Sequence, residues 1–121
     1  MHGKKNGKGK EYYDGKLIFE GIYLNGKKNG NGKEYDYNND LIFEGEYLNG
    51  KRWNGKGKEY NYDDKWEFIG EFVLGKKWNG RIKEYNYYDE LMFEGEIKNG
   101  VVIKYNQYNT EKWTFLIKIS R

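Results

Sequence analysis

The sequence predicts an all-β protein, a single-layer antiparallel β-meander of about ten strands built from repeated hairpins. The first observation is a repeat, because Lys10-Glu11-Tyr12 recurs at Lys33, Lys58 and Lys83, at spacings of 23, 25 and 25 residues. The second is that each period holds two short runs in which apolar and polar residues alternate. The third is that Asn-Gly or Asp-rich turns separate the runs, and these residues tolerate the positive φ of tight hairpin turns.

The first run of each period is predicted to be a half-buried strand. In residues 41–48 one alternating set of side chains is apolar, and the other set includes Glu44 and Glu46. Gly45 follows Phe43 by two residues, and we expect the phenylalanine ring to occupy the space of the missing side chain. The apolar face predicted for the four runs consists of Leu17, Phe19, Gly21, Tyr23, Leu41, Phe43, Gly45, Tyr47, Trp66, Phe68, Gly70, Phe72, Leu91, Phe93, Gly95 and Ile97.

The second run of each period offers two possible inner faces. In residues 55–62, Tyr60 and Tyr62 share one face, and the opposite face is formed by Gly55, Gly57 and Glu59. We expect the tyrosine phase to join the phenylalanine face. One aromatic face would then cover itself through curvature, twist and rings that lean on neighbouring glycines.

The chain is predicted to form a single domain over residues 1–121, with repeats over about 3–100 and a C-terminal cap over about 101–121. A cap is expected because the last period departs from the others, and terminal repeats must close an otherwise open stack. Apolar alternation predicts a final strand within it. The residues that mark the cap are Val101, Ile103, Tyr105, Trp113, Phe115, Ile117 and Ile119.

Composition and charge exclude several classes of protein. Aromatic residues make up 19% of the chain, which argues against disorder, and the absence of cysteine excludes disulfides and thiolate metal sites. The net charge of +3 is too small to indicate a nucleic-acid partner. No apolar run approaches the roughly 20 residues of a membrane span. We therefore expect a soluble, cytoplasmic protein with no cofactor, no metal and no nucleic-acid partner.

Residues suited to catalysis are scarce. Ser120 is the only serine and His2 the only histidine, so a Ser-His-Asp or Cys-His site is nearly excluded. Paired carboxylates such as Glu44 with Glu46, or Glu94 with Glu96, could serve a glycosidase, but they recur from period to period as a solvated polar face would. The prediction is that the protein is not an enzyme, and a carbohydrate-active enzyme is the third alternative.

Basic residue pairs recur in the same turn of successive periods, beginning at Lys4, Lys27, Lys51 and Lys76. A meander would place them along one edge, with acidic turns at the opposite edge. Trp rings next to two of the pairs could insert at a lipid headgroup boundary while the cations meet acidic lipid, or could fold back over the sheet. The candidate binding residues are Lys27, Lys28, Lys51, Arg52, Trp53, Lys76, Lys77 and Trp78.

These residues resemble the MORN repeat, whose pattern is an aromatic residue, a glycine two positions on, a second aromatic residue, a further glycine and a closing Gly-x-Gly. The resemblance covers roughly residues 3–100, with one extra residue at Trp53 and another at Trp78, and Ile82 stands where the second glycine of Gly-x-Gly belongs. The matching residues of the first two copies are Phe19, Gly21, Tyr23, Gly26, Gly30, Gly32, Phe43, Gly45, Tyr47, Gly50, Gly55 and Gly57.

The resemblance implies a single-layer hairpin array used for protein association, scaffolding or contact with anionic phospholipid. The expected function is therefore non-enzymatic protein binding or scaffolding, with a protein partner first and self-association through the terminal strands also open. The basic edge and the aromatic face are the two candidate surfaces, and the Tyr and Phe side chains of that face either pack as core or form an exposed groove for a partner peptide or glycan. The alternative is peripheral binding to anionic membranes through the basic turns, which would make the location membrane-peripheral.

Overall fold

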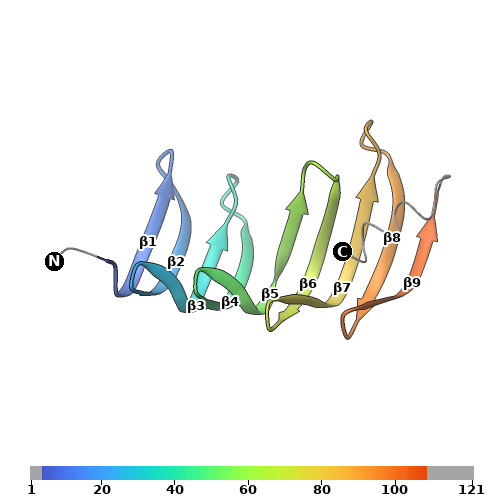
Figure 1. The fold of residues 1–121 in the computed structure, drawn as a ribbon. Coiled ribbons are helices and arrows are strands. Elements are labelled where there is room, and N and C mark those ends of the chain that lie inside the picture. Colours follow the sequence, from blue (N-terminus) through green and yellow to red (C-terminus); the bar gives the residue numbers. More distant parts are fainter. Residues whose placement is uncertain (1–3, 109–121) are drawn as a thin grey trace. The chain divides into compact units, whose positions relative to one another are not determined.

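The structure is a computed structural model that describes residues 4–108. These residues form nine strands and no helix, and the strands are hydrogen-bonded in chain order as one antiparallel sheet (Figure 1). Consecutive strands are neighbours joined by hairpins, so the predicted single-layer meander is confirmed. The strands are β1 (Gly7–Tyr13), β2 (Lys16–Leu24), β3 (Lys27–Tyr35), β4 (Leu41–Leu48), β5 (Lys51–Asn61), β6 (Trp66–Val73), β7 (Lys76–Tyr85), β8 (Leu91–Lys98) and β9 (Val101–Gln107).

Packing divides the chain into two compact units. Unit 1 contains the chain up to Lys58 together with Glu71–Lys76, and unit 2 contains Glu59–Gly70 together with the chain from Lys77 onwards. The boundaries between the units therefore fall within β5, β6 and β7. Each unit has fully buried phenylalanines of its own. These are Phe19 and Phe43 in unit 1 and Phe68 and Phe93 in unit 2.

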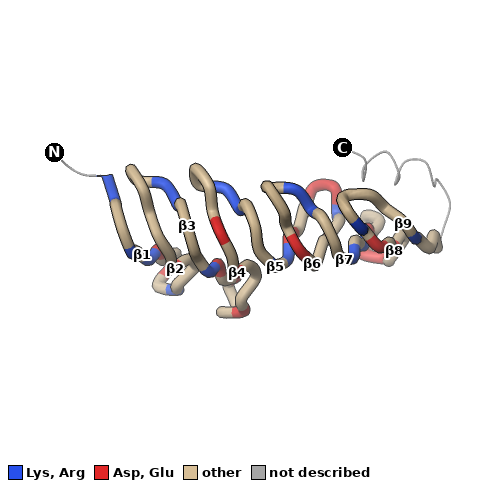
Figure 2. The backbone as a smooth tube through the Cα atoms, turned by 90° about the horizontal axis from the view of Figure 1, so that it is seen from below, with Lys and Arg blue, Asp and Glu red and all other residues tan. Residues whose placement is uncertain are grey.

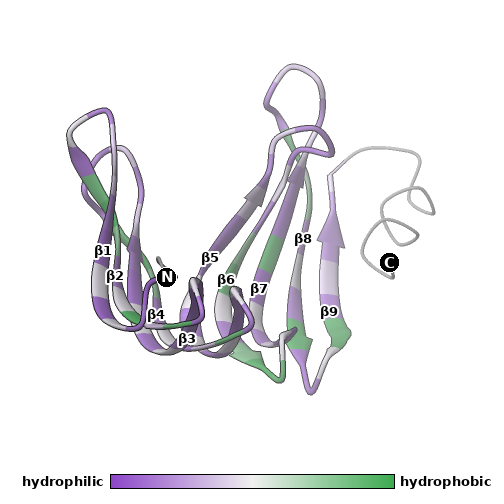
Figure 3. Cartoon of the chain, turned by 60° about the vertical axis from the view of Figure 1, so that its left-hand side comes forward, coloured by the Kyte–Doolittle hydropathy of each residue, from purple (hydrophilic) through white to green (hydrophobic). Residues whose placement is uncertain are grey.

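The predicted alternation of the first runs is confirmed at their centres. In β4, Phe43 and Tyr47 are buried while Glu44 and Glu46 are exposed, and Leu41 departs from the prediction because it is exposed at the strand end. We call the side of the sheet that carries the phenylalanines the inner face and the opposite side the outer face. Hydrophobic residues occupy only short stretches of each strand (Figure 3), and most of the buried hydrophobic side chains are aromatic, with Ile82, Met92 and Ile97 also buried in unit 2.

The tyrosine phase of the second runs does not join the inner face, so that prediction is wrong. In β3 it is Glu34 that lies opposite both Phe19 and Phe43 in the strand pairing, and facing residues share a face. Tyr35 instead donates its hydroxyl hydrogen to Glu20 at 3.0 Å, and Tyr62 is exposed. The physical reason is space on the inner face. The phenylalanine rings fit there only if the neighbouring strands place glycines beside them, so the alternating set that contains the glycines lies on that face.

Glycines on the inner face provide the space that the rings fill. A methyl group added to Gly32 would lie 2.7 Å from the Phe19 ring, and one added to Gly57 would lie 2.9 Å from the Phe43 ring. At Gly45 the nearest atom is instead the backbone carbonyl oxygen of Asn54, at 2.1 Å. Gly32 is opposite both Gly21 and Gly45 in the pairing of unit 1. The expectation that phenylalanine occupies the missing side-chain volume is confirmed.

Alternating charges cross the outer face of unit 1 from strand to strand. Each lysine of this ladder faces a glutamate in the strand pairing, and each glutamate between them faces a lysine on either side. Opposite charges on facing positions favour this register over a slip by one residue. The ladder runs through Lys10, Glu20, Lys33, Glu44 and Lys56.

Part of the predicted cap can be located. Val101, Ile103 and Tyr105 lie on β9 and are exposed. The predicted final strand with Trp113, and the residues His2, Thr110, Thr114 and Ser120, fall outside the described range.

Candidate functional site

The basic pairs follow tight two-residue turns that are built alike. The turn before Lys27 consists of Asn25 and Gly26, whose φ values are 51° and 82°, and the equivalent turn before Lys51 consists of Asn49 and Gly50. Two successive positive φ angles are those of a type I′ turn, whose twist matches that of the flanking strands. Figure 2 shows basic residues where β3 and β5 begin, directly after these turns.

Hydrogen bonds tie each of these turns to the segment that lies one repeat earlier in unit 1. The turn glycine donates its backbone N–H to a carbonyl oxygen, from Gly26 to Lys5 and from Gly50 to Lys28, each at 2.8 Å. An asparagine side chain in the earlier segment, on a strand or just before β1, accepts the neighbouring N–H of the turn. The side chains of Asn6, Asn29 and Asn54 accept the backbone N–H groups of Asn25, Asn49 and Leu74, respectively. The basic turns of unit 1 therefore form one hydrogen-bonded ladder.

The two residues of each basic pair point to opposite faces. Lys27, Lys51 and Lys76 are exposed. Lys28 instead turns inward, with its Nζ atom 4.3 Å from the centroid of the Phe19 ring. The Arg52 guanidinium carbon lies 4.7 Å from the centroid of the Phe43 ring. Adjacent strand residues alternate in direction, so half of the predicted basic edge covers the core instead of facing a partner.

The inward cation of unit 2 follows the same rule. Lys77 places its Nζ atom 4.6 Å from the centroid of the Trp66 ring and 3.4 Å from Oε2 of Glu59. Its side chain is partly exposed, so the ion pair is weakened by solvent. Of the candidate cations, Lys28, Arg52 and Lys77 thus have intramolecular partners in the described part of the chain.

The tryptophans of the candidate site are half-buried and contact the next Gly-containing turn within their own unit, which is a basic turn for Trp53 but not for Trp78. Atoms of the Trp53 ring would lie 3.2 Å from a methyl group added to Gly75, and the Trp53 carbonyl oxygen accepts the Gly75 N–H at 2.8 Å. In unit 2, Trp78 stands in the same relation to Gly100. Trp53 also has no partner in the pairing of β4 with β5, as expected for an inserted residue. Both rings cover turns.

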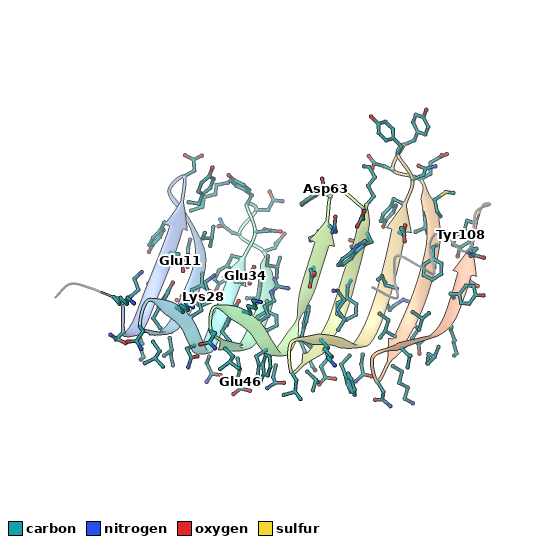
Figure 4. All side chains as sticks on the ribbon, viewed as in Figure 1. Glu11, Lys28, Glu34, Glu46, Asp63 and Tyr108 are labelled. Carbon is teal, nitrogen blue, oxygen red and sulfur yellow. The ribbon has the colours of Figure 1, made fainter. Side chains whose placement is uncertain are left out.

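A glutamate on the inner face of unit 1 joins a tyrosine to the inward arginine. Oε1 of Glu34 accepts hydrogen bonds from the Tyr47 hydroxyl at 2.7 Å and from Nε of Arg52 at 3.1 Å. Arg52 also donates from Nη1 to the Lys58 carbonyl oxygen at 2.7 Å. Glu34 and Lys28 lie on one side of the sheet and Glu46 projects from the other (Figure 4). We call Glu34, Tyr47 and Arg52 the Glu34 cluster.

Ionisation within the Glu34 cluster is shifted by these contacts. Burial alone would raise the pKa of Glu34, but the hydrogen bonds from Arg52 and Tyr47 and the charges of Arg52 and Lys28 lower that pKa. Burial raises the pKa of Tyr47, and the hydrogen bond and negative charge of Glu34 raise it further. The cluster therefore holds a carboxylate and a neutral phenol at neutral pH.

Three of the four paired glutamates of the outer face lie near basic residues, and Glu46 accepts a hydrogen bond from Asn54. Glu44 lies 4.0 Å from Nζ of Lys33, and Arg81 approaches Glu94 at 3.4 Å and Glu96 at 3.9 Å. A shallow groove of about 990 Å³ crosses this face in unit 1, over Gly21 and beside Ile22. Its charged lining consists of three lysines and two glutamates, on Lys8, Lys10, Glu20, Lys33 and Glu44, so both signs of charge are present along its walls. Residues 4–108 contain no cluster of three potential metal-ligating side chains.

Exposed tyrosines beside the acidic turns are functional candidates that the sequence analysis missed. Tyr87 and Tyr88 are 84% and 79% exposed at the tip of the loop between β7 and β8. The Asn86 side chain fixes this loop by accepting the N–H groups of Tyr88 and Glu90 at 2.8 and 3.0 Å. Their sequence signal was direct adjacency to Asp89-Glu90, inside a predicted turn and not inside a strand. The exposed tyrosines are Tyr12, Tyr13, Tyr37, Tyr60, Tyr62, Tyr87, Tyr88, Tyr105 and Tyr108.

A small pocket of about 160 Å³ lies at the acidic turns of unit 2. Tyr60 and Tyr62 stack beside it, with ring centroids 6.1 Å apart and planes 17° apart. Asp89 at its margin pairs with Nζ of Lys65 at 2.6 Å. Aromatic faces and carboxylates therefore converge on one place in this unit.

The structure's described residues include no helix long and apolar enough to cross a membrane. The sequence matches no family model and no curated protein, so the geometry above is the basis for assigning a function.

Proposed function

We propose that this protein is a non-enzymatic binding module whose acidic-turn tyrosines contact a protein partner. The observation that carries the proposal is the exposure of Tyr62, Tyr87 and Tyr88 in a chain whose apolar residues are otherwise scarce. Tyrosine supplies a large contact area with few rotatable bonds, and it is enriched at binding hot spots. A chain with little apolar surface would gain no stability by leaving these rings in solvent.

The inner face is a weaker candidate for partner binding. Phe19, Phe43, Phe68 and Phe93 have at most 1% of their surface exposed, so their rings belong to the core of their own unit. Lys28 and Arg52 cover two of these rings. A partner could reach the rings only by displacing these cations.

The proposal extends to the type of repeat. Four reiterations of a hairpin with phenylalanine over glycine support a MORN-like array, and the proposed binding and scaffolding role is the one that this resemblance implies. The fold alone does not set a function, so the partner must be sought at the exposed residues.

Capture of partners from native extract tests the proposal. The intact chain should recover a specific protein, and replacing Tyr37, Tyr62, Tyr87 and Tyr88 by serine should abolish its recovery. The matched control replaces the exposed Leu24, Leu48 and Leu74 of the basic turns by serine and should retain the partner. Equal recovery by both variants, or no protein recovered by the intact chain, would refute the proposal.

A second candidate is peripheral binding to anionic membrane through the basic turns. One observation favours it, because Leu24, Leu48 and Leu74 are exposed directly beside the turns that carry the exposed Lys27, Lys51 and Lys76. Cations near an acidic leaflet contribute about 1 kcal/mol each, and adjacent leucines could enter the headgroup region.

Liposome sedimentation distinguishes this candidate. Salt-sensitive binding to acidic vesicles should disappear when Lys27, Lys51 and Lys76 are changed to glutamine. The control changes the exposed outer-face Lys8, Lys10 and Lys56, which alters the net charge equally. No binding of the intact chain at low salt, or equal loss in both variants, would exclude the basic turns as a membrane site.

A further inference from the structure

The pocket at the acidic turns of unit 2 has the size of one side chain. Its volume of about 160 Å³ is well below the roughly 300–1,000 Å³ of pockets that bind drug-sized ligands. An extended partner could place a single head group there while the rest of its chain lies outside. The lining residues that matter for recognition are Tyr60, Tyr62, Trp66, Glu67, Tyr85 and Asp89.

The lining favours a cation. Tyr60 and Tyr62 present stacked rings, and an aromatic face attracts a cation within about 6 Å of its centroid. Tyr62 is 84% exposed, so its ring is available to a molecule arriving from solvent. Trp66 adds a third aromatic ring to the lining, although its own cation partner is Lys77.

Carboxylates complete the pocket. Glu67 accepts a hydrogen bond from the Tyr85 hydroxyl at 2.9 Å, which fixes both side chains at the wall. Asp89 stands at the margin with 80% of its side chain exposed, so its second oxygen can accept further hydrogen bonds. Asp63 lies in the turn above β6 (Figure 4), and Asp64 and Glu90 belong to the same two acidic turns.

The pocket already holds one ammonium group from its own chain. Lys65 Nζ lies 2.6 Å from Oδ1 of Asp89 and bridges the two acidic turns of unit 2. Such an exposed ion pair contributes little, so an arriving cation can replace it. Lys65 therefore shows that an ammonium group fits at this site, and it competes with any cation that arrives from a partner.

From this geometry we propose that the pocket binds a lysine or arginine side chain presented by a basic segment of a protein partner. Charge complementarity selects this occupant, since the lining residues carry two carboxylates, on Glu67 and Asp89, against the one ammonium group of Lys65. Asp63, Asp64 and Glu90 in the adjoining acidic turns add further negative charge. The inference rests on the proposed protein-binding function and names the chemistry of the partner.

Unit 1 offers a matched site without the pocket. Lys16 follows its acidic turn as Lys65 does, but its Nζ atom bonds the Tyr37 carbonyl oxygen at 2.8 Å, and no carboxylate bond of Lys16 is found in the described residues. The rings of Tyr13 and Tyr37 are edge to face at 5.9 Å, not stacked. Lys16→Met therefore changes the net charge as Lys65→Met does, without removing a competitor from the pocket.

The test is a titration of the full chain with a fluorescent peptide of alternating arginine and glycine at low salt, with an alternating glutamate and glycine peptide as the opposite-charge probe. Lys65→Met should tighten binding of the basic peptide about threefold, because the internal competitor is removed. Asp89→Asn and Tyr62→Ser should each weaken it by about the same factor. Asparagine suits the φ of 63° at position 89. Lys16→Met should leave the affinity within twofold of the intact chain.

Several results would overturn the inference. These are no binding of the basic peptide, stronger binding of the acidic peptide, or equal effects of Lys65→Met and Lys16→Met, which would indicate only a general electrostatic attraction. Circular dichroism of each variant establishes that the sheet has formed. If a partner is captured through the tyrosines while the basic peptide does not bind, this inference fails and the proposed function stands. If no partner is captured, the proposed function itself fails.

Discussion

The basic turns and the acidic turns differ in how they use the aromatic residues beside them. At the basic turns of unit 1, Lys28 and Arg52 lie across the rings of Phe19 and Phe43, and asparagine side chains link one turn to the next. At the acidic turns, loop-forming side chains such as Asn86 bond within their own loop, and the adjacent tyrosines remain in solvent. The repeated positive charges at the basic turns therefore help to hold the fold together, whereas the repeated negative charges at the acidic turns lie beside an accessible surface.

The difference shows that a cation beside an aromatic ring can cover that ring within its own chain and is then not available to a partner. In a single sheet with no second layer, the rings need a cover, and the long stems and flat head groups of Lys and Arg provide one. The acidic residues are too short to lie over rings in this way. Tyrosines at the acidic turns consequently keep the exposure that partner binding requires.

The largest expected effect comes from removing a ring at the covered side. Phe43→Ala should lower the free energy of unfolding by about 3–5 kcal/mol, because the fully buried ring fills the space over neighbouring glycines and lies under Arg52. Denaturant unfolding followed by circular dichroism measures the change. The matched variant Tyr62→Ala removes an exposed ring and should change it by less than about 0.5 kcal/mol. Comparable losses in the two variants would remove the distinction between the two kinds of turn.

The next effect concerns the two members of one basic pair. Arg52→Ala should cost about 1.5–3 kcal/mol, since it takes a charged hydrogen bond from the partly buried Glu34 and uncovers the Phe43 ring. Lys51→Ala, one residue earlier and exposed, should cost less than about 0.5 kcal/mol. A double-mutant cycle with Glu34→Gln isolates the pair. Equal costs at positions 51 and 52 would contradict the assignment of opposite directions to the pair.

Acid should weaken the covered side through the same cluster. The folded-state pKa of Glu34 lies below its ordinary value of 4.5, so its carboxylate contributes stability that is present above that pH and lost as the pH falls through the folded-state pKa. Unfolding measured between pH 7 and pH 2 should therefore show a steeper loss in the intact chain than in Glu34→Gln. An equally steep loss of stability in Glu34→Gln would contradict the assignment of the acid effect to this carboxylate.

Much of the fold could be predicted from local patterns. The meander, the burial of Phe43 and Tyr47 and the nesting of rings on glycine follow from a period of two within a period of about 25, because both depend on residues close in the sequence. Alternation also contained the signal that Lys51 and Arg52 point to opposite faces. The prediction of a basic edge does not include this alternation, because it takes each basic pair as a single charged group.

The inner phase of the second runs could not be obtained in the same way. Hydrophobicity alone predicts that Tyr60 and Tyr62 lie on the inner face. In the structure, the inner face instead carries the set that contains Gly55 and Gly57. The choice depends on the volume of rings carried by the neighbouring strand and on shifts of register, such as the one between Glu34 and Tyr35. These are cross-strand properties, and a single sequence does not state them. Because the sequence analysis assigns these tyrosines to the inner face, it does not predict that they are exposed.

The smallest expected effect concerns the link between basic turns. Asn54 accepts the Leu74 N–H at 2.9 Å and donates to Glu46 at 3.1 Å, so Asn54→Ala should cost about 1 kcal/mol of unfolding free energy. Asn38→Ala, in an exposed acidic turn, is the matched change and should cost only a few tenths of a kcal/mol. Amide hydrogen exchange gives the sharper measurement, because the Leu74 N–H should lose protection in Asn54→Ala while amides near Asn38 keep theirs. Unchanged protection at Leu74 would mean that the side chain does not hold the turn, and that the backbone bond from Gly75 to Trp53 alone joins this turn to its neighbour.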